Sequence, residues 1–229
     1  MKYLEKFILN MNQKILTKRN DLISAVINII GLFIFTILLI QLIENSIILN
    51  NSSKIFQSIL IIIVITIFFI IQIYYHILQQ KNIEAKLWQR IDRGSMLFLI
   101  SLIFTPILLN FTQLKSAIII VSIQWSLSIV GMVILIFKKK ISRSLAPILT
   151  FLIGIIGIVY FSIFLSNLNL IEIIAFIAGS IFLILAGVIY VVKKPNLIAN
   201  IFEFHELFHS FLTIGCLMLF YLIRLAILS

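Results

Sequence analysis

Seven long apolar runs constrain this chain more than any other feature of its sequence. Each run is close to or above the length of about 17 to 25 residues that a helix needs to cross about 30 Å of hydrocarbon. The runs are Leu22–Ile43, Ile55–Leu78, Ser95–Phe111, Ala117–Phe137, Leu145–Leu165, Leu170–Val192 and Phe202–Leu228. They predict an all-α integral membrane protein, a bundle of seven transmembrane helices.

The composition agrees with a lipid environment. Of the 229 residues, 62% are hydrophobic and only 11% are charged, whereas about a quarter of the residues of a soluble domain are charged. The first run is too long for a cleavable signal, and no small-residue cleavage site follows it, so it should remain as an anchor. We therefore expect a multi-pass protein of a cell membrane, with a basic N-terminal segment over residues 1–21 and one membrane domain over residues 22–229.

The net charge of +10 is a topology signal because of where the basic residues lie. Fifteen of the eighteen Lys and Arg residues fall in alternate segments: before the first run and after the second, fourth and sixth runs. The positive-inside rule then places the N-terminus in the cytoplasm and, after seven crossings, the C-terminus outside. This placement accounts for the charge without nucleic acid. We expect membrane lipid as the partner, and no pattern predicts a protein partner.

The three histidines of the chain are predicted to lie at one level of the membrane. His76 ends the second run, and His205 and His209 begin the seventh, so both positions are on the cytoplasmic side. His205 and His209 are one helical turn apart, about 40° around the axis, and their rings can face one ion. Three neutral imidazoles and a water form the usual shell of a catalytic Zn²⁺. Asp92, at the start of the third helix, lies at the same level.

Each of these residues also has a structural interpretation. A histidine at a membrane interface is commonly an amphipathic side chain that reaches toward water, and Asp92 could be a helix N-cap. Glu206 could complement the positive end of the seventh helix. However, ionisable groups in membrane helices are costly, and this chain places all of its histidines together. The residues therefore favour a metal site.

Small residues in the sixth run predict close helix packing. Ala178, Gly179, Ser180 and Gly187 would let this helix approach a neighbour closely, as small residues do in membrane helix interfaces.

Several motifs accompany the histidines. The segment from His205 to His209 reads His-Glu-Leu-Phe-His and is followed by Phe211 and Gly215. The other motifs are Tyr75-His76, Arg90-Ile91-Asp92 with Phe104-Thr105-Pro106 downstream, the stretch from Asp21 to Gly31, and Lys193-Lys194-Pro195. In order and spacing they resemble the progestin and adipoQ receptor family, in its bacterial hemolysin III branch, over essentially the whole chain.

The resemblance implies roles for individual residues. In structurally known members such as the adiponectin receptors, three histidines of the second and seventh helices hold zinc near the cytoplasmic face, with an aspartate close by. Those roles would fall to His76, His205 and His209 as metal ligands and to Asp92 as the catalytic residue.

This chain also departs from the family pattern. Gln72 replaces the family's serine one turn before the second-helix histidine, and it can hydrogen-bond a water but cannot act as a nucleophile. Asn28 stands where the first-helix motif usually has a histidine, and Leu219 stands where a late histidine is common. The predicted metal ligands are all retained.

Three functional hypotheses follow. The first is a zinc-dependent hydrolase of a membrane lipid amide, with Asp92 orienting or deprotonating the attacking water; the family resemblance implies ceramide-like substrates, and the branch name implies cytolysis. The second is a non-enzymatic receptor or regulator in which zinc joins the second and seventh helices. The third is an intramembrane metalloprotease, because the segment from His205 matches His-Glu-x-x-His with Glu206 as base.

Overall fold

A computed structural model of the chain describes residues 2–81, 85–138, 142, 144–163, 165, 168–199 and 201–228, with side chains from residue 21 onward. The basic side chains before residue 21, and Lys139, Lys140 and Arg143, which contribute to the predicted orientation, lie outside the described part.

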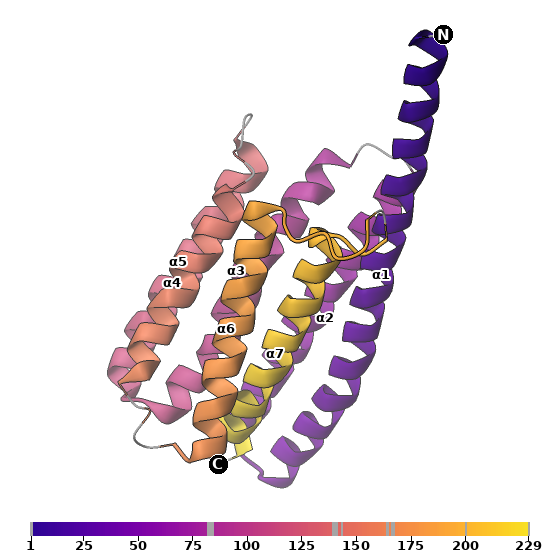
Figure 1. The fold of residues 1–229 in the computed structure, drawn as a ribbon. Helices are drawn as coiled ribbons and strands as arrows, with labels where there is room; N and C mark the ends of the chain where they lie inside the picture. The colour runs from indigo at the N-terminus through magenta and orange to yellow at the C-terminus, as the bar shows by residue number, and fades with distance from the viewer. Residues whose placement is uncertain are drawn as a thin grey trace.

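Seven α-helices account for nearly all of the described residues (Figure 1). They are α1 (Lys2–Ile48), α2 (Ser52–Gln80), α3 (Lys86–Phe111), α4 (Leu114–Phe137), α5 (Leu145–Ser162), α6 (Leu170–Val192) and α7 (Phe204–Leu228). All seven are long and apolar enough to cross a membrane, the first over Asp21–Ile48. The described residues contain no β-strand, only an isolated bridge between Ile198 and Phe202. The predicted class, a bundle of seven membrane-spanning helices, is confirmed.

The helix α3 lies at the centre of the bundle. It contacts α2, α4, α5 and α7. Around it, the helices from α4 to α7 contact one another in chain order, and α1 contacts both α7 and α2. In its most apolar stretch of 18 residues, 78% of the residues are buried, compared with 50% for α7, the next most buried helix. The first turn of α1 and the last turn of α7 lie at opposite ends of the bundle (Figure 1).

The central position of α3 explains why its predicted bounds were too short. The helix begins at Lys86, well before the apolar run that starts at Ser95, and it has the lowest mean hydropathy of the seven spans, 1.9. A helix surrounded by protein can carry polar residues that pair with its neighbours. Ser101 contacts Ser128 of α4 at 2.7 Å, and the indole nitrogen of Trp125 donates to Thr105 at 2.9 Å.

Two of the helices that start at the end away from the histidines, α2 and α6, follow ordinary capping rules. Asn51 caps α2, where its side chain accepts hydrogen bonds from the backbone N–H groups of Ser53 and Lys54. Asn169 and Glu172 form a capping box at the start of α6. Such caps satisfy N–H groups that have no partner within the helix, so these residues fix where α2 and α6 begin.

The prediction of close packing along α6 is confirmed at one glycine and wrong at another. A Cβ atom added to Gly179 would lie 3.2 Å from the carbonyl oxygen of Gly215, and one added to Gly215 would lie 3.1 Å from that of Gly179, so α6 and α7 approach closely there. A Cβ atom on Gly187 would meet no atom within 4 Å. Gly187 instead lines an open cleft in the bundle.

Candidate metal centre

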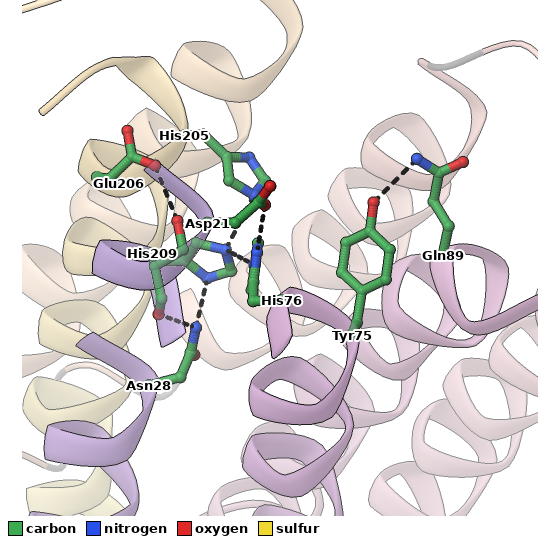
Figure 2. Close-up of polar contacts among 9 residues, drawn as sticks. Asp21, Asn28, Tyr75, His76, Gln89, His205, Glu206 and His209 are labelled. Carbon is green, nitrogen blue, oxygen red and sulfur yellow. Dashed lines mark hydrogen bonds and ion pairs between the residues drawn. The ribbon is translucent and has the colours of Figure 1, made fainter. Parts of the chain in front are cut away.

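The structure brings the three histidines together at one end of the bundle (Figure 2). The Nε2 atom of His209 lies 3.0 Å from Nε2 of His76 and 3.3 Å from Nε2 of His205. His76 and His209 are 1% exposed, and His205 is partly buried. The neighbouring Tyr75 points away from this group and accepts a hydrogen bond from Gln89. The predicted convergence of α2 and α7 at one site is therefore present.

The spacing of the ring nitrogens fits a metal ion. Zinc binds imidazole nitrogens at about 2.0 to 2.1 Å in a tetrahedral shell, which places neighbouring ligand nitrogens about 3.3 to 3.4 Å apart. The two measured separations, 3.0 and 3.3 Å, are close to this value, and the ligand atoms of the three histidines all lie within 4.8 Å of one another. Three imidazoles leave the fourth position of such a shell open.

The helix α1 contacts the outer nitrogens of two of these rings. The Oδ1 atom of Asp21 lies 3.1 Å from Nδ1 of His76. The side-chain amide nitrogen of Asn28 donates to the carbonyl oxygen of Ser24 at 2.8 Å and lies 3.4 Å from Nδ1 of His209. Asn28 thus borders the site without belonging to the three-histidine group.

Asp92 and Gln72 form a buried polar layer between α2 and α3. Asp92 is 5% exposed, and its carboxyl group is close enough to His76 to interact with it electrostatically. The amide nitrogen of Gln72 donates to the carbonyl oxygen of Asp92 at 3.3 Å and to the hydroxyl of Ser95 at 3.2 Å. Gln72 therefore ties α2 to the turn of α3 that carries Asp92.

Two acceptors in this layer lack a donor among the described residues: Oδ1 of Asp92 and Oε1 of Gln72. A buried acceptor without a donor costs about 1 to 3 kcal/mol, so buried polar groups are nearly always satisfied by protein or by ordered water. These oxygens fit a site that also holds a water molecule and are suited to accept hydrogen bonds from it.

The carboxylate of Glu206 is engaged by α1 and by its own helix. Glu206 is 0% exposed; its Oε1 accepts from the hydroxyl of Ser24 at 2.9 Å, and its Oε2 accepts from the backbone N–H of Glu203 at 2.9 Å. The second contact satisfies an N–H group at the start of α7. Glu206 therefore lies at the start of α7 as its structural interpretation expected, and it also joins α7 to α1, which the sequence did not predict.

An apolar cleft of roughly 320 Å³ lies beside the histidines, between α5 and α6, with α3 and α7 at its base. Tyr190 and Phe208 line it, and their ring centroids lie 6.2 and 6.0 Å from that of His205. Along α5 the lining runs from Pro147 to Ile158, which at 1.5 Å per residue is about 17 Å. One leaflet of the hydrocarbon core is about 15 Å thick, so the cleft has the length of a leaflet.

Comparison with known families agrees with these observations. Residues 16–220 match the sequence model of the family described as haemolysin-III related. The chain belongs to the haemolysin III family. The match includes every residue discussed at the candidate metal centre, from Asp21 on α1 to His209 on α7.

Sequence reasoning missed three residues of this haemolysin III site. Asp21 was seen only as part of a motif, and Ser24 and Ser95 were not singled out. Asp21 contacts a residue 55 positions away and Ser24 one 182 positions away, so spacing along the chain carries no sign of these pairs. One feature of the sequence could have indicated Asp21: it is an acidic residue at the same membrane level as the histidines.

Proposed function

We propose that this haemolysin III family protein is a zinc-dependent hydrolase that cleaves an amide bond of a membrane lipid. The proposal is supported above all by the convergence of three imidazole nitrogens, with separations of 3.0 and 3.3 Å, beside a buried carboxylate. A bound zinc ion would supply Lewis acidity, polarising a carbonyl group and lowering the pKa of a water at its open position.

The side chains of this chain have complementary roles in the proposal. His76, His205 and His209 hold the ion, and Asp92 accepts a proton from the attacking water at Oδ1 and passes it to the leaving amine. Gln72 holds the turn that carries Asp92 through the hydrogen bonds described above. This role needs only the amide of Gln72, so the loss of the family's serine is compatible with hydrolysis.

The apolar cleft supports a lipid as the substrate. Its rim residues Phe151, Val188 and Val191 are about half exposed on the surface of the bundle, where lipid chains would meet them. A hydrocarbon chain in the cleft would bring the adjoining polar group to Tyr190 and Phe208, next to His205. The proposed orientation, with the N-terminus in the cytoplasm, places this cleft in the cytoplasmic leaflet.

The position of Glu206 argues against a metalloprotease of the His-Glu-x-x-His type. In that mechanism the glutamate is the general base for the metal-activated water. Both carboxylate oxygens of Glu206 are engaged, by Ser24 and by the backbone of Glu203, on the side of α7 that faces α1. The Oδ1 atom of Asp92, by contrast, has no donor among the described residues and could accept from a water at the site.

A non-enzymatic receptor or regulator is the second candidate. Gln72 favours it, since this residue fills a position where the resemblance implies a hydroxyl, and its amide nitrogen joins α2 to α3. In that case zinc would only tie α2 to α7.

The experiment compares Asp92→Asn with Glu206→Gln in purified protein, measuring zinc content and lipid-amide turnover on the same preparations. We expect Asp92→Asn to keep zinc and to lose turnover by about 100- to 10,000-fold, the effect of removing a general acid or base. Glu206→Gln should keep both. The reverse ranking would indicate a protease-like site. Unchanged turnover in both variants, or no turnover in the zinc-loaded wild type, would exclude the hydrolase and leave the structural role of zinc.

A further inference from the structure

The carboxylate of Asp21 lies against the outer nitrogen of one candidate metal ligand. Asp21 is at the start of the membrane span of α1, and its Oδ1 atom is 3.1 Å from Nδ1 of His76 on α2. The side chain of Asp21 is 24% exposed, whereas that of His76 is 1% exposed. Figure 2 shows Asp21 above the ring of His76, with a dashed line marking this contact.

This contact fixes where the imidazole of His76 carries its proton. An ionised carboxylate can only accept hydrogen bonds, so the contact requires an N–H at Nδ1 of His76. In the neutral ring the lone pair then belongs to Nε2. That atom is the one that faces Nε2 of His209 at 3.0 Å. The contact therefore holds His76 in the tautomer that binds a metal through Nε2.

We propose that Asp21 is a positioning residue of the metal centre, which orients His76 and increases the zinc affinity of the site through the hydrogen bond to Nδ1. The inference rests on the metal centre of the proposed function but not on any hydrolysis. Carboxylates that accept from a metal-bound histidine fix the ring and make it a stronger ligand.

The contact to His209 is of a different kind. Asn28 approaches Nδ1 of His209 with its amide nitrogen at 3.4 Å, a long separation, while the same nitrogen donates to Ser24. Asn28 is uncharged, and one of its two amide protons is directed to the backbone of its own helix. Asp21 is thus a charged outer partner of one ligand, His76, and its removal should affect the site more than removal of Asn28.

A purely structural role for Asp21 would have different consequences. The pair also joins α1 to α2, so its loss could lower the stability of the metal-free protein. A structural role therefore predicts a lower unfolding midpoint without metal and an unchanged zinc affinity. A positioning role predicts a lower zinc affinity, together with an altered ligand environment of the ion.

The test uses the full chain in detergent, stripped of metal, in mildly alkaline buffer where free histidine is neutral. Zinc affinity is measured by competition with a chromophoric chelator for the wild type, Asp21→Ala and Asp21→Asn. Glu44→Gln serves as the control, because Glu44 is an exposed acidic residue of the same helix. Absorption spectra of the cobalt-loaded proteins report the ligand environment, and the unfolding midpoint without metal reports the fold.

We expect Asp21→Ala to bind zinc about 10- to 100-fold more weakly than the wild type, the usual effect of losing such an outer partner. Asp21→Asn should lose less, since its Oδ1 can still accept from Nδ1, and Glu44→Gln should match the wild type. The nearly isosteric Asp21→Asn keeps the test decisive if Asp21→Ala does not fold.

Wild-type affinity and an unchanged cobalt spectrum in the folded Asp21 variants would overturn the inference while leaving the metal centre intact. A wild-type protein that binds neither zinc nor cobalt would overturn the metal centre and this inference together. Loss of turnover alone, with unchanged affinity, would also count against a positioning role.

Discussion

The hydrogen bond between Ser24 and Glu206 gives the sharpest test of how α1 and α7 are held at the site. Both residues are 0% exposed, and the hydroxyl of Ser24 donates to the carboxylate at 2.9 Å. Hydrogen bonds to charged groups contribute about 1.5 to 3 kcal/mol, whereas side-chain bonds between membrane helices average about 0.6 and reach about 1.7 kcal/mol. For this buried hydrogen bond to a carboxylate we expect a contribution in the upper part of the range for membrane helices.

The perturbation is a double-mutant cycle of Ser24→Ala, Glu206→Gln and the double variant. Ser24→Ala removes one of the two donors to a buried carboxylate and should lower the free energy of unfolding by about 1 to 2 kcal/mol. Glu206→Gln should cost about 1 kcal/mol, because its amide oxygen can still accept from the N–H of Glu203. The coupling energy should be about 1 kcal/mol.

The assay is unfolding in mixed detergent micelles with increasing sodium dodecyl sulfate, followed by circular dichroism, with zinc content measured on the same samples. Ser52→Ala is the control, since Ser52 is exposed and its loss should stay within about 0.5 kcal/mol. Zinc should remain in every variant. Zero coupling would refute the contact, and loss of zinc in Glu206→Gln would refute the assignment of its carboxylate to α1.

Two further predictions concern orientation and the cleft. A reporter that is active only in the cytoplasm should work when fused before α1 and fail when fused after α7; the opposite pattern would overturn the orientation derived from the basic residues. Gly187→Phe should fill the cleft and reduce turnover of a long-chain lipid amide by about 100-fold, the effect of misplacing a substrate, with zinc retained. Gly187→Ala, whose Cβ meets no atom within 4 Å, should behave as the wild type, and full activity of Gly187→Phe would remove the cleft from the substrate path.

The fold could be predicted because a helix that crosses lipid must be long and apolar, and all seven spans are. Six of the seven membrane spans follow the apolar runs closely, since their outer faces must be apolar. This holds for α1 over its span Asp21–Ile48, although the helix itself begins at Lys2. The exception, α3, is shielded by its neighbours, so its first two turns carry Gln89, Arg90 and Asp92, and hydropathy alone placed its start too late.

The histidines could also be predicted to meet, because seven alternating crossings assign each helix end to one side of the membrane. The contacts that α1 makes with the site could not be predicted. Whether Asp21 faces His76, or Ser24 faces Glu206, depends on the rotation of α1 about its own axis, and both faces of a membrane helix are apolar apart from such residues. For the same reason the sequence could not distinguish Gly187, which lines the cleft, from Gly179, which packs against α7.

The central claim is that His76, His205 and His209 hold one metal ion. The most direct measurement is the zinc content of the purified wild type and of His76→Ala, His205→Ala and His209→Ala, with X-ray absorption at the zinc edge of the wild type. We predict about one zinc per chain, bound by three nitrogens at about 2.0 to 2.1 Å with one further light ligand, and its near-complete loss in each variant. A wild type without zinc after zinc loading, or a folded variant with unchanged zinc content, would contradict the account.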